Sequence, residues 1–234
     1  MCTVIVHVPE AADAPTRVLA VRDEDPTRAW DPLGSWWPEL PGVVGVRDTR
    51  TGGAWLAADT DAGRLAVVLN RADMLPEERA TGSRGHVVLE AVAGRGVADA
   101  PPTHGFNLVE VVGGRTRVHH WDGDAVRTVE LGPGVHMIAH GDVDDTETAR
   151  IAAWHDAFPP PAPGDDWWRP WLAALEATTE VPPTDDRAII RDNRPHGFPT
   201  LSLLVCAASV TAAGAEVLYG ELDEPGAWNH PTLR

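Results

Sequence analysis

Short apolar segments, separated by turns rich in glycine, proline and aspartate, occupy most of the first two-thirds of the chain. Runs of about four to eight apolar residues between turn residues are typical of β-strands. The predicted strands are residues 3–8, 18–22, 53–59, 65–70, 106–112, 117–121, 126–131 and 136–140. Several intervening turns, such as Thr51-Gly52-Gly53, have hairpin length, which favours antiparallel pairing.

Helical patterns appear between and after these strands. They cover residues 85–93, 144–157 and 168–178. We expect the sequence Asp144-Asp145-Thr146 to cap the second helix, and Asp165 or Asp166 to cap the third. Residues 201–207 and 216–222 predict a closing pair of strands. This order of elements predicts one α+β layered domain over residues 1–234.

The composition of the chain argues against some classes of binding partner. The chain has 19 basic residues, all arginine, against 35 acidic ones, a net charge of −16. Because proteins that bind phosphate backbones carry basic faces, this charge argues against nucleic acid and anionic membrane surfaces. The longest apolar stretch, residues 201–210, is shorter than the ~20 residues of a membrane-spanning helix, so we expect no membrane insertion. The sequence leaves the oligomeric state open.

Two cysteines and the N-terminal sequence predict the compartment. Two cysteines are too few for a disulfide-stapled secreted fold, and the first residues lack the features of a signal peptide. A cytoplasmic protein is therefore predicted. Adjacent His119 and His120 would point to opposite faces of a strand. No CxxC pattern and no HxxxH pattern on a predicted helix occurs, and His136 and His140 lie on a predicted strand, where residues four apart are ~13 Å from each other, so we predict no metal site.

Cys2 is the main candidate for chemistry. If the initiator methionine is removed, Cys2 carries a thiol and a free α-amine on one residue. The amine titrates near ~8 and can accept the thiol proton, so nucleophile and base would come from one residue. The alternative is that Cys2 is a small apolar residue at the start of a buried strand.

Several motifs, in order and at matching spacing, resemble the NRDE family, also called the transport and Golgi organisation protein 2 family. The resemblance covers residues 1–145 well and the rest loosely. The motifs are Met1-Cys2-Thr3-Val4-Ile5-Val6, Leu19-Ala20-Val21-Arg22-Asp23-Glu24, Trp36-Trp37-Pro38-Glu39, Gly45-Val46-Arg47-Asp48, Gly52-Gly53-Ala54-Trp55-Leu56, Val68-Leu69-Asn70-Arg71, Ser83-Arg84-Gly85 and Gly105-Phe106-Asn107-Leu108.

The resemblance implies a fold and a set of site residues. The fold would be a four-layer αββα sandwich of two antiparallel sheets, similar to the N-terminal-nucleophile hydrolases, and the reaction would be hydrolysis of a small-molecule amide. Arg22 and Asp23 would support the Cys2 nucleophile, because a guanidinium favours thiolate and a carboxylate orients the α-ammonium. Asn70 would donate to the oxyanion. The alternative for Arg22 and Asp23 is a solvated charge cluster at the end of a strand. The alternative for Asn70 is a turn residue that ends a strand.

The sequence also departs from the family pattern. Val21 replaces the asparagine of Asn-Arg-Asp-Glu, and Ile138-Ala139-His140-Gly141 replaces a Leu-Ser-Asn-Ala segment. In amidase relatives an asparagine near that place helps to form the oxyanion hole. His140 is therefore the candidate for that position here, since its imidazole can donate one hydrogen bond.

A non-catalytic role on the same scaffold is the alternative function. Members of the family have been linked to haem handling, so haem, or another flat apolar ligand, is the alternative partner, and no cofactor is required for the hydrolase. The candidate ligand-binding residues are Trp36, Trp37, Glu24 and Asn107. The tryptophan pair precedes a proline in a turn-rich loop, which fits a pocket rim as well as core packing.

Overall fold

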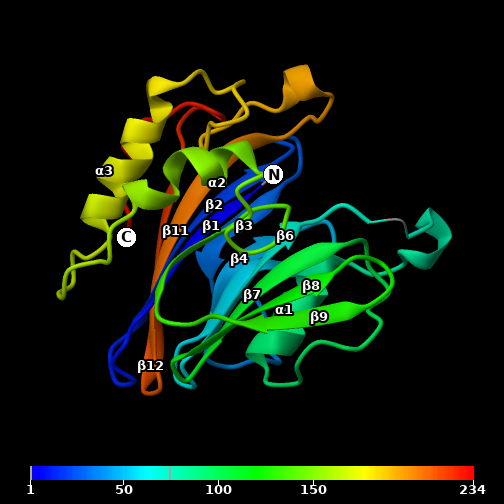
Figure 1. Cartoon of the computed structure of the whole chain (residues 1–234). Coiled ribbons are helices and arrows are strands. Elements are labelled where there is room, and N and C mark those ends of the chain that lie inside the picture. The colour runs from blue at the N-terminus through cyan, green and yellow to red at the C-terminus, as the bar shows by residue number, and fades with distance from the viewer. Residues whose placement is uncertain (1, 74) are drawn as a thin grey trace.

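Two antiparallel sheets, described here from a computed structural model, form the centre of the molecule (Figure 1). The structure describes residues 2–73 and 75–234. The first sheet has five strands in the order β10-β1-β2-β11-β12. Their bounds are β1 (Thr3–Val8), β2 (Thr16–Glu24), β10 (Gly134–Ile138), β11 (Leu201–Thr211) and β12 (Gly214–Glu221).

The second sheet has seven strands in sequence order, from β3 to β9. Each strand therefore pairs with the next one along the chain. Short turns such as 49–53, between β4 and β5, predict this pairing, whereas the connection between β6 and β7 is long and contains α1. The bounds are β3 (Trp30–Gly34), β4 (Val43–Asp48), β5 (Ala54–Asp59), β6 (Arg64–Asn70), β7 (Phe106–Val112), β8 (Arg115–Trp121) and β9 (Val126–Glu130).

Helices cover the outer face of each sheet (Figure 1). Helix α1 (Arg84–Val92) packs on β5 and β6 of the seven-stranded sheet. Helices α2 (Ala149–Trp154) and α3 (Arg169–Ala177) lie over the five-stranded sheet. Short 3-10 turns complete the elements, η1 (Glu77–Arg79), η2 (His155–Ala157), η3 (Thr178–Glu180) and η4 (Arg194–His196).

The alternation of side chains along β1 divides the core in two. Val4 and Val6 pack between the sheets, in a cluster that continues through the seven-stranded sheet to α1. Ile5 points the other way, into a cluster that contains Trp171 of α3. The strand is apolar on both faces because both are covered, which is the arrangement of a sandwich with helices outside. This confirms the predicted α+β sandwich.

Two strands and the helix caps differ from the sequence predictions. Strands β3 and β4 were not predicted, because β3 contains Pro32 and β4 has Gly45 where a Cβ would meet the backbone of the next strand. Helix α2 begins only at Ala149, since the Asp144 carboxylate binds His136 and the backbone N–H of Met137 instead of capping the helix.

Helix α3 also lacks the predicted cap. Its N-cap residue is Trp168, with no side-chain capping bond, so neither Asp165 nor Asp166 caps it. The helix begins with Pro170 in its first turn, where a missing N–H costs nothing. None of the described helices combines the length and the apolar composition that crossing a membrane would need.

A contact between two glycines fixes where α1 begins. A Cβ on Gly53, just before β5, would lie 2.6 Å from the carbonyl carbon of Gly85, in the first turn of α1. The two backbones therefore approach more closely than any side chain allows. Ser83 caps the helix by accepting from the Gly85 N–H at 3.2 Å and donates to the Thr51 hydroxyl at 3.1 Å. Helix α1 is thus attached at its first turn to the β4–β5 connection.

The close contact between Gly53 and Gly85 predicts how far one added methyl group lowers the free energy of unfolding. We expect Gly53→Ala to lower the free energy of unfolding by about 1–3 kcal/mol, because α1 must move away from β5. Gly132→Ala is the matched control, since a Cβ there meets nothing within 4 Å, and it should change stability by less than about 0.5 kcal/mol. Urea unfolding measures both values. Equal stabilities of the two variants would contradict the close approach.

Candidate active site

Cys2 lies directly before β1 and is 6% exposed. Its sulfur accepts from the backbone N–H of Asp23 at 3.4 Å and donates to the Asp23 carbonyl at 3.6 Å. Burial, with a further contribution from the Asp23 carboxylate, raises the pKa of the Cys2 thiol above its ordinary value. In this state the sulfur is a neutral thiol, so a base is needed to make it a nucleophile.

The end of β2 brings Arg22 and Asp23 beside the thiol. Arg22 is 3% exposed, and its guanidinium lies 3.6 Å from the carboxylate of Glu24 and over the ring of Trp30. Strand β2 pairs with β1 in the register Thr3↔Val21, so these residues flank the start of β1. The predicted trio of Cys2, Arg22 and Asp23 is therefore brought together.

Two buried residues that the sequence did not suggest hold this trio. Ser202 of β11 donates to the Asp23 carboxylate at 2.6 Å and accepts from the backbone N–H of Arg191. Arg150 of α2 donates to the Thr3 hydroxyl at 3.1 Å. Burial lowers the pKa of Arg150 to about 10, so the guanidinium remains charged at neutral pH near Asp23 and Cys2. No local pattern marks a buried arginine or serine, because both are usually solvent-exposed.

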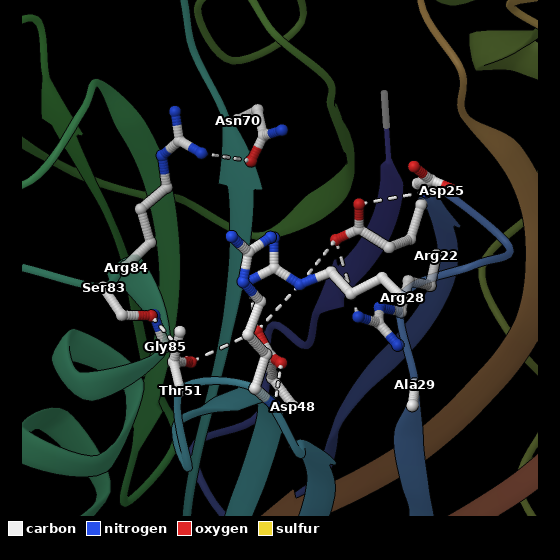
Figure 2. Close-up of polar contacts among 12 residues, drawn as sticks. Arg22, Asp25, Arg28, Ala29, Asp48, Thr51, Asn70, Ser83, Arg84 and Gly85 are labelled. Atoms are coloured by element: carbon white, nitrogen blue, oxygen red, sulfur yellow. Dashed lines mark hydrogen bonds and ion pairs between the residues drawn. The ribbon is translucent and has the colours of Figure 1, made fainter. Parts of the chain in front are cut away.

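A cleft of about 700 Å³ opens at Cys2. That volume is within the range of sites that hold small molecules. Ionisable and polar side chains dominate its walls, and Figure 2 shows part of them, with Arg84 and Asn70 on one side and Arg22 and Arg28 on the other. The lining residues are Cys2, Arg22, Asp23, Glu24, Arg28, Asp48, Arg50, Thr51, Ala54, Trp55, Val68, Asn70, Glu77, Ala80, Thr81, Gly82, Ser83, Arg84, Gly85 and His104.

Asn70, at the end of β6, lines this cleft and is oriented by Arg84. Its side-chain oxygen accepts from Arg84 Nη1 at 3.0 Å, while Arg84 Nε donates to the carbonyl of Gly105 at 2.9 Å. With the oxygen bound to Arg84, the amide nitrogen lies on the side away from that residue (Figure 2). Asn70 therefore offers N–H donors to a ligand, and Arg84 is a positioning residue that the sequence analysis did not identify.

His140 does not line the cleft. It is half-buried, and burial lowers its pKa, so the imidazole is neutral at pH 7. Strand β10 pairs with β1 through Val4↔Ile138, and continuing that register by two residues leads to His140 opposite Cys2. His140 is thus adjacent to the start of β1 but is not among the residues that line the cleft.

Asn107 of β7 is buried and contacts the segment that carries His140. Its amide nitrogen donates to the carbonyls of Ala139 and Gly141, at 2.9 and 2.7 Å. Its oxygen lies 2.7 Å from Nδ1 of His120, so that nitrogen carries the hydrogen. Burial lowers the pKa of His120 to about 4, which keeps the ring neutral. Asn107 holds a backbone turn and does not line the cleft.

The tryptophan pair also lies outside the cleft lining. Trp37 is buried and donates from Nε1 to the carbonyl of Gly52 at 2.8 Å. Trp36 donates to the carbonyl of Pro32, and Arg47 stacks over its ring. Of the four residues predicted to bind a ligand, only Glu24 lines the cleft, and the tryptophan found there is Trp55. Among the described residues, no group of three or more His, Cys, Asp or Glu side chains is arranged to hold a metal ion.

Comparison with known proteins gives a family and a fold. The family model described as Transport and Golgi organisation 2 matches residues 1–154. A search of curated proteins finds no match. Among solved structures, the chain is similar to a Caenorhabditis elegans ortholog of N-acylethanolamine-hydrolyzing acid amidase, with a TM-score of 0.53 and 10% identity over 88% of this chain and 92% of that chain. The two chains therefore share a fold.

The environment of Cys2 predicts its reactivity in the chain that keeps Met1, a residue outside the described ones. Iodoacetamide attacks the thiolate, so we expect alkylation of Cys2 to rise with pH and to reach its midpoint above the ~8.5 of a free cysteine. Intact-mass measurement of the Cys206→Ser variant follows Cys2 alone. A Cys2→Ser control should stay unmodified, because Cys206 is a core residue. A midpoint below that of free cysteine would contradict the raised pKa.

Proposed function

The chain belongs to the Transport and Golgi organisation 2 family, and we propose that it hydrolyses the C–N bond of a small-molecule amide with Cys2 as the nucleophile. The observation that supports this most directly is the position of the thiol. It lies at the start of β1, next to buried Arg22 and Asp23, and it lines a cleft large enough for a small molecule. Cys206, by contrast, is a buried core cysteine that does not line the cleft.

The first half-reaction forms a thioester. Once Met1 is removed, the α-amine of Cys2 accepts the thiol proton and the sulfur attacks the amide carbon. The oxygen of the resulting tetrahedral intermediate accepts a hydrogen bond from the Asn70 amide, whose orientation Arg84 fixes. The α-ammonium then gives its proton to the leaving nitrogen, and the C–N bond breaks.

The second half-reaction returns the enzyme to its starting state. Water loses a proton to the α-amine, attacks the thioester carbon and releases a carboxylic acid, and the sulfur recovers its proton. Arg22 and Arg150 favour the charged thiolate during both steps, because each brings a buried positive charge near the sulfur. In this proposal the Asp23 carboxylate, which accepts a hydrogen bond from Ser202, orients the α-ammonium.

The amide class of substrate has support from the structural neighbour. The Caenorhabditis elegans protein is an ortholog of an amidase that hydrolyses N-acylethanolamines, which are amides. The haem or apolar-ligand carrier, the alternative from the sequence, would place a flat apolar molecule against the ionisable walls of the same cleft. Removing water from those side chains without replacing its hydrogen bonds costs free energy, so the cleft favours a polar amide over haem.

The nucleophile is tested with a panel of small amides. We expect the chain with Met1 removed to release amine from at least one amide, and Cys2→Ser to lower kcat by at least about 1000-fold, because the nucleophile is lost. The Cys206→Ser variant is the control and should keep wild-type activity. Equal turnover by Cys2→Ser and wild type would overturn the proposal. A Soret shift on haem titration, with no turnover of any amide, would support the carrier instead.

The oxyanion donor is tested separately. Loss of one such donor typically costs about 10²–10³ in kcat, so we expect Asn70→Ala to lower kcat by that factor with a small change in KM. Arg84→Lys should lower kcat less, since its ammonium can still donate to the Asn70 oxygen but not to the Gly105 carbonyl as well. A kcat for Asn70→Ala within threefold of wild type would remove Asn70 from the mechanism.

A further inference from the structure

Some of the charged side chains that line the cleft form ion pairs with other described residues, and some do not. Glu24 lies 3.6 Å from Arg22 and 3.9 Å from Arg28, and Asp48 also pairs with Arg28. Glu77 lies 3.3 Å from His104. These contacts account for the acidic groups of the outer cleft, while Asp23 lies deeper and binds Ser202.

Two arginines of the lining, Arg84 and Arg50, form no ion pair within 4 Å among the described residues, and the carboxylates of Asp73 and Glu24 act on Arg84 only from a greater distance. Arg84 donates to backbone carbonyls and to the neutral amide of Asn70. Arg50 is exposed on the β4–β5 turn, where its backbone N–H binds the Asp48 carboxylate and its guanidinium forms no ion pair with another described residue. Burial lowers the pKa of Arg84, so this cation is incompletely solvated and would gain from an anion.

The backbone adds to the positive potential at the same wall. Gly82, Ser83 and Gly85 also line the cleft, so the first turn of α1 faces it. Helix N-termini carry a partial positive charge and favour anions. The β4–β5 turn lies against that first turn, through the hydrogen bond of Ser83 to Thr51 and the contact of Gly53 with Gly85. This brings the segment that carries Arg50 next to the segment that carries Arg84.

We infer that the substrate carries a negatively charged group, a carboxylate in its simplest form, which binds to Arg84 and Arg50 while the scissile amide lies over Cys2. The chain as a whole carries a net charge of −16, so anions are not attracted by the overall field. Selection for the anion therefore depends on these two side chains. The inference rests on the proposed hydrolase for the position of the amide, but the anion site itself does not require turnover.

Binding is tested with matched pairs of ligands on the Cys2→Ser chain. Each pair consists of an N-acylglycine and its glycinamide, or of a dicarboxylic acid monoamide and the corresponding diamide, so that the members differ only in a carboxylate or a carboxamide. By calorimetry we expect the carboxylate member to bind at least about fivefold more tightly at low salt, and less so at high salt.

Variants identify the cations. Arg50→Gln should weaken carboxylate binding by about three- to fivefold and Arg84→Gln by about tenfold, because the second residue is more buried. Arg50→Gln should not change the affinity for carboxamides by more than about twofold. Arg115→Gln is the matched control, an exposed arginine on β8 outside the cleft, and should change nothing. Equal affinity within each pair, including no measurable binding of the carboxylates, would overturn the anion site.

Hydrolysis of the same pairs separates the two proposals. Preferential binding of carboxylates without hydrolysis of any pair would count against the hydrolase and leave the anion site in place. Hydrolysis that favours the neutral amides, and that is unaffected by Arg50→Gln, would overturn the anion site and leave the hydrolase. Both proposals are supported if the carboxylate members are hydrolysed with a lower KM than the neutral amides and if Arg50→Gln raises that KM.

Discussion

Hydrogen bonding along both edges of β1 is the constraint on which the rest of the site depends. The strand lies between β2 and β10, so its position is set from its first residue onward. Cys2 directly precedes that strand, and both the N–H and the carbonyl of Asp23 contact its sulfur. A terminal residue would normally be mobile. Here the pairing of β1 with its neighbours and the contacts with Asp23 hold the Cys2 side chain in a buried position.

The opposite wall of the cleft has an independent support. Gly53 and Gly85 bring the start of β5 against the start of α1, and this contact places Arg84 where it can hold Asn70. Cys2, the proposed nucleophile, thus adjoins the five-stranded sheet, and Asn70, the proposed oxyanion donor, belongs to the seven-stranded one. Their separation is set by the packing of two sheets, which is rigid because core side chains fill the space between them.

The sequence predicted the architecture better than it predicted the site. Strands such as Thr3–Val8 and Phe106–Val112 were located to the residue, because apolar runs and turn residues are local signals. The sequence also singled out Cys2, Arg22, Asp23, Glu24 and Asn70, and all five line the cleft. Ser202 and Arg150 could not be found in this way, since their roles come from contacts with Asp23 and Thr3, far away in sequence. The position of Trp36 and Trp37 before a proline in a turn-rich loop suggested a pocket rim, but their indole N–H groups bind the backbone carbonyls of Pro32 and Gly52.

Strand β11, in the C-terminal part of the chain, supports the strand that carries Arg22 and Asp23. The family model ends at residue 154, yet β11 (Leu201–Thr211) lies between β2 and β12 and pairs with β2 through Asp23 itself. Without β11, the strand that carries Arg22 and Asp23 would present an unpaired edge to solvent, which is a template for aggregation. The matched segment therefore lacks one of the two strands that pair with β2. A truncated gene product that ends near residue 154 would retain every residue that lines the cleft and still lack the strand that holds the carboxylate beside the thiol.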